Sequence, residues 1–291
     1  MLSVTPIPEG KESAEITPIY TGIKKALQTE TVPLIFQYLA PFPVYLRYIW
    51  EQVKKNIDDP FFGQNAQSLV QFSDDAIQEI YTPSAKTRFT IESIPTSIER
   101  DQIRVATQNL QRVTSILYLI SIAIRESLKG VNLGIKQIGS RVSNREKVLF
   151  EEISNDFIPQ ERLQKNRPST ELEKSHPFLA TSNFAKFLKA IEEEMQKLLK
   201  QEEYLHRRVA LEKFALSRLI LLREPIDSSF KTVSQKASSE EGFSELLYIL
   251  SELFPTQTPH KLLTSSVMIQ ALRNQNQKSQ PFSGIPLPPP K

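Results

Sequence analysis

The sequence predicts an all-α protein built from two fused, pseudo-symmetric multi-helix repeats, with a functional site at the seam between them. Apolar residues recur at spacings of three and four along most of the 291-residue chain, and the strict alternation typical of β-strands is nearly missing. A passage in residues 39–51 returns in residues 179–193, and residues 119–124 return as residues 263–268. This repetition indicates a duplication, and binding sites form preferentially where two such units meet.

The first repeat is expected to span residues 6–130. Its longest helix is predicted from Asp101 to Lys129, because apolar residues follow helical spacing there and fill every side of its middle. A helix that is apolar all round must be surrounded by other helices, so this one belongs to the core. Residues 82–95 carry two prolines and predict a loop. Shorter helices are expected at Ser13–Gln28, Pro43–Lys54 and Ala66–Tyr81.

Residues 131–177 are expected to join the repeats. They contain a predicted helix at Arg145–Asn155, followed by a polar linker with three prolines. The second repeat is expected over residues 178–275. Its helical stretch from Asn183 to Arg223 is either one long helix or two helices with a break near Gln201. Further helices are expected at Glu240–Leu253 and His260–Gln275.

Composition excludes several classes of function. The 36 basic and 33 acidic residues leave a net charge of only +3, without the concentrated basic stripe that nucleic acids require. The chain has no cysteine, which excludes disulfides, zinc-thiolate sites and thiol catalysis. Neither a signal peptide nor an apolar span of about 20 residues is present. We therefore expect a cytoplasmic protein that binds neither nucleic acid nor membrane.

The familiar catalytic motifs are missing. The sequence has no GxGxxG, GxxxxGK[ST], GxSxG or HExxH motif, and 8 glycines make a phosphate-binding loop improbable. Glu202 and His206 stand four residues apart and are expected to form a surface ion pair, so no metal site is predicted. Asp74 is expected to begin or cap a helix, and Glu192–Glu194 to form a solvated face. Glu126 is expected to pair with its basic neighbours Arg125 and Lys129.

Three passages resemble one known family. They are ITPIYTGIKKAL, VPLIFQYLAPFPVYLRYIWEQV and the helix ending ISIAIRESL. The likeness is to the group I 2-haloacid dehalogenases, all-α proteins of two fused helical repeats with the active site between them. Membership implies hydrolysis of short 2-halocarboxylic acids without metal or organic cofactor. In that family an aspartate activates the attacking water, an asparagine orients it, and aromatic side chains line the pocket.

The resemblance also places the site on this sequence. The asparagine position of the long helix falls on Thr114, and the aspartate position falls near Ser175 to Pro177, so the chain departs from the family at both. The aromatic pocket positions fall near Thr31 and Leu34. The residues that could replace the aspartate as a general base are Glu171, Glu173 and His176.

Three functions remain open at this point. The first is a hydrolase of short 2-substituted carboxylic acids, with Thr114, Glu173 and His176 as catalytic candidates and Thr31, Leu34 and Ser175 in the pocket. The second is a protein of the same fold that binds a small carboxylate without turning it over, or has a structural role. The third is an interaction scaffold, in which the helical stretch from Asn183 to Arg223 and the tail recruit partners. The tail, residues 276–291, is expected to be disordered and ends in IPLPPPK. A homodimer is compatible with all three.

Overall fold

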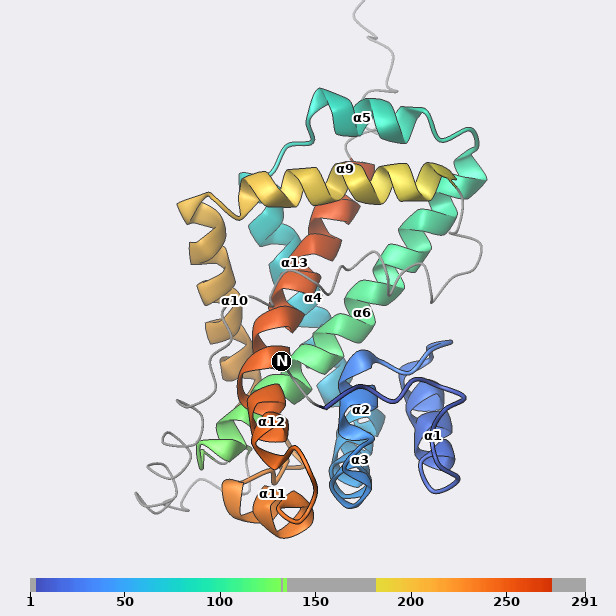
Figure 1. The fold of residues 1–291 in the computed structure, drawn as a ribbon. Helices are drawn as coiled ribbons and strands as arrows, with labels where there is room; N and C mark the ends of the chain where they lie inside the picture. The colour runs from blue at the N-terminus through green and yellow to red at the C-terminus, as the bar shows by residue number, and fades with distance from the viewer. Residues whose placement is uncertain (1–3, 132, 135–181, 274–291) are drawn as a thin grey trace, which may run out of the picture.

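The structure is a computed structural model that describes residues 4–131, 133–134 and 182–273. The described residues are all-α, and none of them forms a strand (Figure 1). The predicted linker at residues 131–177, with its helix at Arg145–Asn155, lies outside the described residues apart from 131, 133 and 134. The tail at residues 276–291 lies outside them entirely.

The N-terminal half contributes six helices to the described part. They are α1 (Thr17–Leu27), α2 (Leu34–Leu39), α3 (Pro43–Asp58), α4 (Pro60–Ile80), α5 (Ala85–Glu92) and α6 (Ser97–Leu128). The short helices α1 to α3 pack together at one end, and α6 runs diagonally through the body (Figure 1). From Val113 to Ile124 nearly every side chain of α6 is buried, as its apolar pattern predicts.

The C-terminal half contributes the remaining elements. They are α9 (Ser182–Leu198), α10 (Glu202–Leu219), α11 (Phe230–Ala237), α12 (Phe243–Tyr248), a π-helical turn η3 (Ile249–Leu253) and α13 (Phe254–Arg273). The most extensive packing in the molecule is between α13 and α6, which cross at its centre (Figure 1). Helices α4 and α10 flank this central pair.

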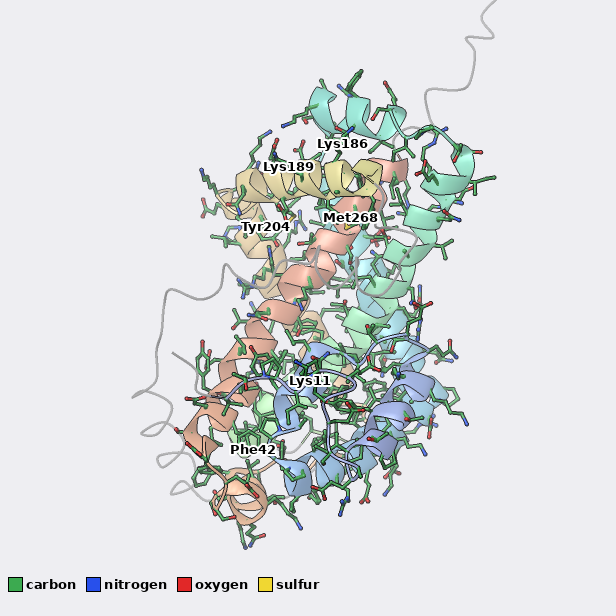
Figure 2. All side chains as sticks on the ribbon, turned by 45° about the vertical axis from the view of Figure 1, so that its right-hand side comes forward. Lys11, Phe42, Lys186, Lys189, Tyr204 and Met268 are labelled. Atoms are coloured by element: carbon green, nitrogen blue, oxygen red, sulfur yellow. The ribbon has the colours of Figure 1, made fainter. Side chains whose placement is uncertain are left out.

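The repeated sequence passages are helical where their second copies are described. Residues 45–51 lie in α3 and residues 187–193 in α9, and Tyr45, Leu46 and Ile49 are buried, as are the matching residues of α9. The second lies in α6 and α13, where residues 119–124 and 263–268 are both buried. On α9 the lysines Lys186 and Lys189 stand on the exposed face (Figure 2). The same apolar positions face the core in both halves, and the domain boundaries themselves stay a prediction.

Two predictions, one of a loop and one of a helix start, were wrong in segments that contain prolines. Residues 82–95 were expected to be a loop, yet they contain α5: Pro83 precedes the cap Ser84, whose Oγ accepts from the Thr87 backbone N–H, and Pro95 follows the helix. Both prolines therefore bracket the helix instead of breaking it. Helix α13 begins six residues before the expected start, because it accommodates Pro259 within its first turns.

The break in the long stretch of the second half is real. Helix α9 ends at Leu198 and α10 begins at Glu202, so Gln201 marks the junction as one of the two expectations had it. Asp59 and Thr96 cap α4 and α6, each accepting a hydrogen bond from a backbone N–H two or three residues on. No described helix has the length and apolar character needed to cross a bilayer.

Candidate functional site

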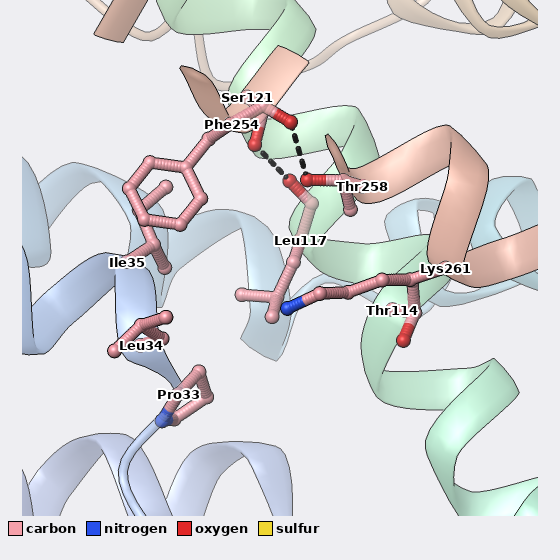
Figure 3. Close-up of a pocket in the computed structure, with 9 residues that line it drawn as sticks. All are labelled: Pro33, Leu34, Ile35, Thr114, Leu117, Ser121, Phe254, Thr258 and Lys261. Atoms are coloured by element: carbon pink, nitrogen blue, oxygen red, sulfur yellow. Dashed lines mark hydrogen bonds between the residues drawn. The ribbon is translucent and has the colours of Figure 1, made fainter. Parts of the chain in front are cut away.

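The candidate site is a pocket at the junction of α2, α6 and α13. Three segments form its walls: the start of α2 with the preceding proline, one face of α6, and one face of the first half of α13 (Figure 3). The space within amounts to about 350 Å³, including solvent at its mouth. Because that figure includes open solvent, the enclosed space is much smaller, about 30 Å³, so any ligand held there must be small. Its described lining residues are Pro33, Leu34, Ile35, Thr114, Leu117, Ser121, Phe254, Thr258 and Lys261.

Helical spacing explains how each wall is made. On α6 the lining residues are Thr114, Leu117 and Ser121, separated by three and four positions, which places them on one face. On α13 the lining positions 254, 258 and 261 have the same periodicity. Since α6 comes from the first half and α13 from the second, the pocket lies where the two halves meet.

Two hydroxyls of the pocket have their protons engaged within their own helices. Ser121 Oγ donates to the Leu117 carbonyl at 2.7 Å, and Thr258 Oγ1 donates to the Phe254 carbonyl at 2.6 Å (Figure 3). Such bonds leave each oxygen as an acceptor toward the pocket. The third hydroxyl differs: Thr114 is 3 % exposed, and its Oγ1 has no hydrogen-bond partner among the described residues. Thr114 can therefore donate to a ligand or a water.

One of the described lining residues is charged. Among the described residues that line it, Lys261 carries a cation and none carries a carboxylate. Next to it, His260 is directed away, with Nδ1 3.1 Å from the Oη of Tyr204 on α10. Burial lowers the pKa of His260 to about 4, and the charges of Arg208 and Lys261 act in the same direction. At neutral pH His260 is therefore uncharged.

Four of the predicted site residues lie outside the described part of the chain. They are Glu171, Glu173, Ser175 and His176. Leu34 and Thr114 do lie in one pocket, on α2 and α6 respectively. Thr31 is not among the described lining residues; it precedes α2 by three positions, and its carbonyl accepts a hydrogen bond from Thr29 Oγ1. Phe254 and Thr258 were missed, because α13 was expected to start only at His260; Lys261 lay within the expected helix but was not singled out.

The other carboxylates singled out in the sequence have structural partners. Glu126 pairs with Arg125 at 2.8 Å and with Lys129 at 3.6 Å, as expected. Glu202 and His206 form the expected exposed pair at 3.7 Å. Two expectations were wrong. Asp74 lies buried within α4 instead of at a helix start, because Gln111 and Arg273 satisfy its carboxylate, and Glu194 is buried against α5 instead of lying on a solvated face.

Metal binding finds no support within residues 4–131, 133–134 and 182–273. A group of three or more His, Asp or Glu side chains that could hold an ion is not found there. The carboxylates named above each form hydrogen bonds or ion pairs with a different neighbour, on another helix or in their own helix.

Comparisons with known proteins identify the fold. Neither a protein-family model nor a curated protein matches the sequence. Among solved structures, a D-2-haloacid dehalogenase mutant is similar with a TM-score of 0.71 and 17% identity, over 92% of this chain and 96% of that one. A mutant in complex with D-2-CPA gives a TM-score of 0.70 at 17% identity, and the enzyme in complex with L-LA gives 0.69 at 18%, with the same coverage. The chain has the all-α fold of these dehalogenases.

Proposed function

We propose that this chain binds a short 2-substituted carboxylate in the pocket between α2, α6 and α13, and hydrolyses a 2-halocarboxylate there without a cofactor. The supporting observation is that Leu34 and Thr114, chosen by resemblance from two distant parts of the sequence, line one pocket. The shared fold of the D-2-haloacid dehalogenases adds to this. Fold similarity alone carries no activity, so the argument depends on the pocket.

The proposed chemistry is a displacement at C2. Water attacks C2, the carbon–halogen bond breaks, halide leaves with the bonding electrons, and the water proton passes to a base, giving the 2-hydroxy acid. Thr114 Oγ1 is placed to hold that water, because it is buried in the pocket wall without a partner among the described residues. The base in this scheme is Glu171, Glu173 or His176.

A second candidate function is binding without turnover. The described lining residues include hydroxyls and one ammonium group but no carboxylate or imidazole. A pocket without a base loses the roughly 10²–10⁴-fold that general-base catalysis contributes, and would hold an acid without hydrolysing it.

One experiment separates these functions. Halide release from racemic 2-chloropropionate and from 2-bromoacetate is followed between pH 6 and 10, with heat-denatured protein as the control, and calorimetry measures binding of the same acids. We expect saturable release that falls at least tenfold in one of the variants Glu171→Gln, Glu173→Gln and His176→Ala. Binding without release would support the second function, and neither binding nor release would contradict both.

A further inference from the structure

The enclosed part of the pocket is too small for an organic acid unless one wall moves outward. Its space of about 30 Å³ compares with the roughly 10–15 Å³ that one water molecule needs. The walls on α6 and α13 belong to the most extensively packed pair of described helices, so they cannot separate without losing many buried contacts. The remaining wall is the chain at Pro33 and Leu34, which enters α2 and is only partly buried (Figure 3). This is the wall that a ligand displaces.

The main chain of this wall is held at Val32, the residue before Pro33. The Val32 N–H donates to Glu9 Oε2 at 2.9 Å, and the Val32 carbonyl accepts from Gln37 Nε2 at 2.7 Å. Pro33 has no N–H and adds no backbone donor of its own. Since the Val32 side chain is buried in the core, these two bonds orient its peptide groups and set the direction in which Pro33 leaves. The bond to Glu9 is the stronger of the two, because its acceptor is charged.

Glu9 is itself held in place by α1. Its other carboxylate oxygen, Oε1, lies 2.5 Å from Lys24 Nζ, and the two side chains are only 29% and 35% exposed, so water screens this pair in part. The segment that carries Glu9 is fixed at Ile7. The Ile7 N–H donates to the Gln37 carbonyl at 3.0 Å, and the Ile7 carbonyl accepts from Tyr20 Oη at 2.7 Å. The N-terminal segment therefore connects α1 to the start of α2.

We propose that Glu9 is a positioning residue of the pocket, which holds the wall at Val32 and so limits the size of the acid that the pocket admits. Glu9 is not among the described lining residues, so it acts through the backbone of Val32. Its bond resists the outward movement of Pro33 and Leu34 that a bulkier 2-substituent requires. Acids with a small 2-substituent are therefore admitted, and acids with longer branches are excluded. This inference rests on the proposed function, of which it names a specificity-determining residue.

The test uses two acids that differ only in size and have no halogen to release. Isobutyrate carries methyl branches at C2, and 2-ethylbutyrate carries an ethyl group in place of each. Calorimetry measures the Kd of both for the full chain and for Glu9→Ala, Gln37→Met and Glu15→Ala. Gln37→Met removes the second bond to Val32. Glu15 lies in the same N-terminal segment but pairs at the surface with Arg47 on α3 at 3.4 Å, so Glu15→Ala is the control.

We expect the wild-type protein to bind isobutyrate about tenfold more tightly than 2-ethylbutyrate, as added methylenes in a tight pocket imply. Glu9→Ala should reduce this ratio to about threefold or less, through tighter binding of 2-ethylbutyrate. Gln37→Met should reduce the ratio by a smaller factor, because the bond that it removes has a neutral acceptor, and Glu15→Ala should match the wild type. An unchanged ratio in Glu9→Ala would overturn the inference, as would an equal loss of affinity for both acids, which signals a structural role. A wild-type protein without size preference would also overturn it.

Hydrogen exchange tests the same bond without a ligand. The amides of α2, residues 34–39, should exchange about threefold or more faster in Glu9→Ala than in the wild type, because local opening at the wall is eased. The amides in the middle of α6 should keep their rates. Equal rates in α2 would overturn the inference. Faster exchange in α2, together with wild-type protein that binds neither isobutyrate nor 2-chloropropionate, would instead contradict the proposed function and leave Glu9 with a structural role only.

Discussion

Leu34 at the start of α2 and Thr114 in the middle of α6 face the same pocket, although they belong to separate parts of the sequence. Helix α13 of the second half closes the pocket opposite them through Phe254, Thr258 and Lys261. Since α6 and α13 also form the most extensive contact between described helices, the site is built on the central helix pair of the fold.

Thr114 should contribute more to the affinity for a ligand than Thr258, the other threonine of the pocket. The variant Thr114→Val keeps the shape of the side chain and removes a hydroxyl that has no partner among the described residues, so binding of 2-chloropropionate should weaken by about five- to tenfold. Thr258→Val removes a hydroxyl already bonded to Phe254, and should change binding less than twofold. Calorimetric titration compares the two, and equal effects would exclude a special role for Thr114.

Asp74 should be a strong contributor to stability. Its carboxylate accepts from Gln111 Nε2 at 2.7 Å and pairs with Arg273 at 3.1 Å, tying α4 to α6 and α13. Gln111→Leu leaves this buried carboxylate without one partner, which should lower the free energy of unfolding by about 2 kcal/mol or more. Asp75→Asn, at an exposed residue next to it, should change it by less than about 0.5 kcal/mol. Urea unfolding measures both, and similar values for the two variants would refute the assignment.

Glu193 and Glu194 provide a matched pair on α9. Burial would raise the pKa of Glu194, but hydrogen bonds from Ser84 and Thr87 outweigh it and hold that pKa below its usual value. Glu194→Ala should therefore lower the free energy of unfolding by about 1–3 kcal/mol. Glu193 forms an ion pair with Lys86 at the surface, where water screens it, so Glu193→Ala should lower the free energy of unfolding less than Glu194→Ala does. A larger effect at Glu193 in urea unfolding would contradict this ranking.

His260 should make the protein acid-sensitive. Burial lowers its pKa to about 4 in the folded protein, against an ordinary value of 6.5, so the unfolded chain binds a proton first as the pH falls. Stability should decline between pH 6.5 and pH 4, by up to about 3 kcal/mol from this group. Unfolding midpoints measured across this range should fall less for His260→Gln than for the wild type. The exposed variant His206→Gln is the control and should follow the wild type; a His260→Gln curve parallel to the wild type would refute the assignment.

The sequence was most informative where packing follows simple periodicity. The buried middle of α6 and the junction at Gln201 both follow from apolar spacing and its interruption. The described parts of the repeated passages are helical with their apolar positions buried. These features depend on which face of a helix is apolar, and that information is local to each helix.

Features that depend on contacts between helices could not be derived in this way. In the sequence Pro83 and Pro95 resemble helix breakers, whereas in the structure Ser84 caps α5 between them. Glu194 was expected to be solvated, but α5 packs against it and Thr87 donates a hydrogen bond to it. Phe254 and Thr258 were missed for a similar reason, since the start of α13 depends on how the chain accommodates Pro259. The resemblance to a known family, and not spacing, brought Leu34 and Thr114 together in advance.

The most direct test of the central claim is to fill the pocket with a larger side chain and measure how tightly the ligand binds. Calorimetric binding of 2-chloropropionate is compared between the wild type and Leu34→Trp, with circular dichroism and urea unfolding confirming that the variant is folded. Leu34 is only partly buried at the first position of α2, so the larger side chain can extend into the pocket space. We expect the wild type to bind and the variant to bind at least tenfold more weakly. Equal binding by the folded variant would contradict the claim that this pocket is the ligand site.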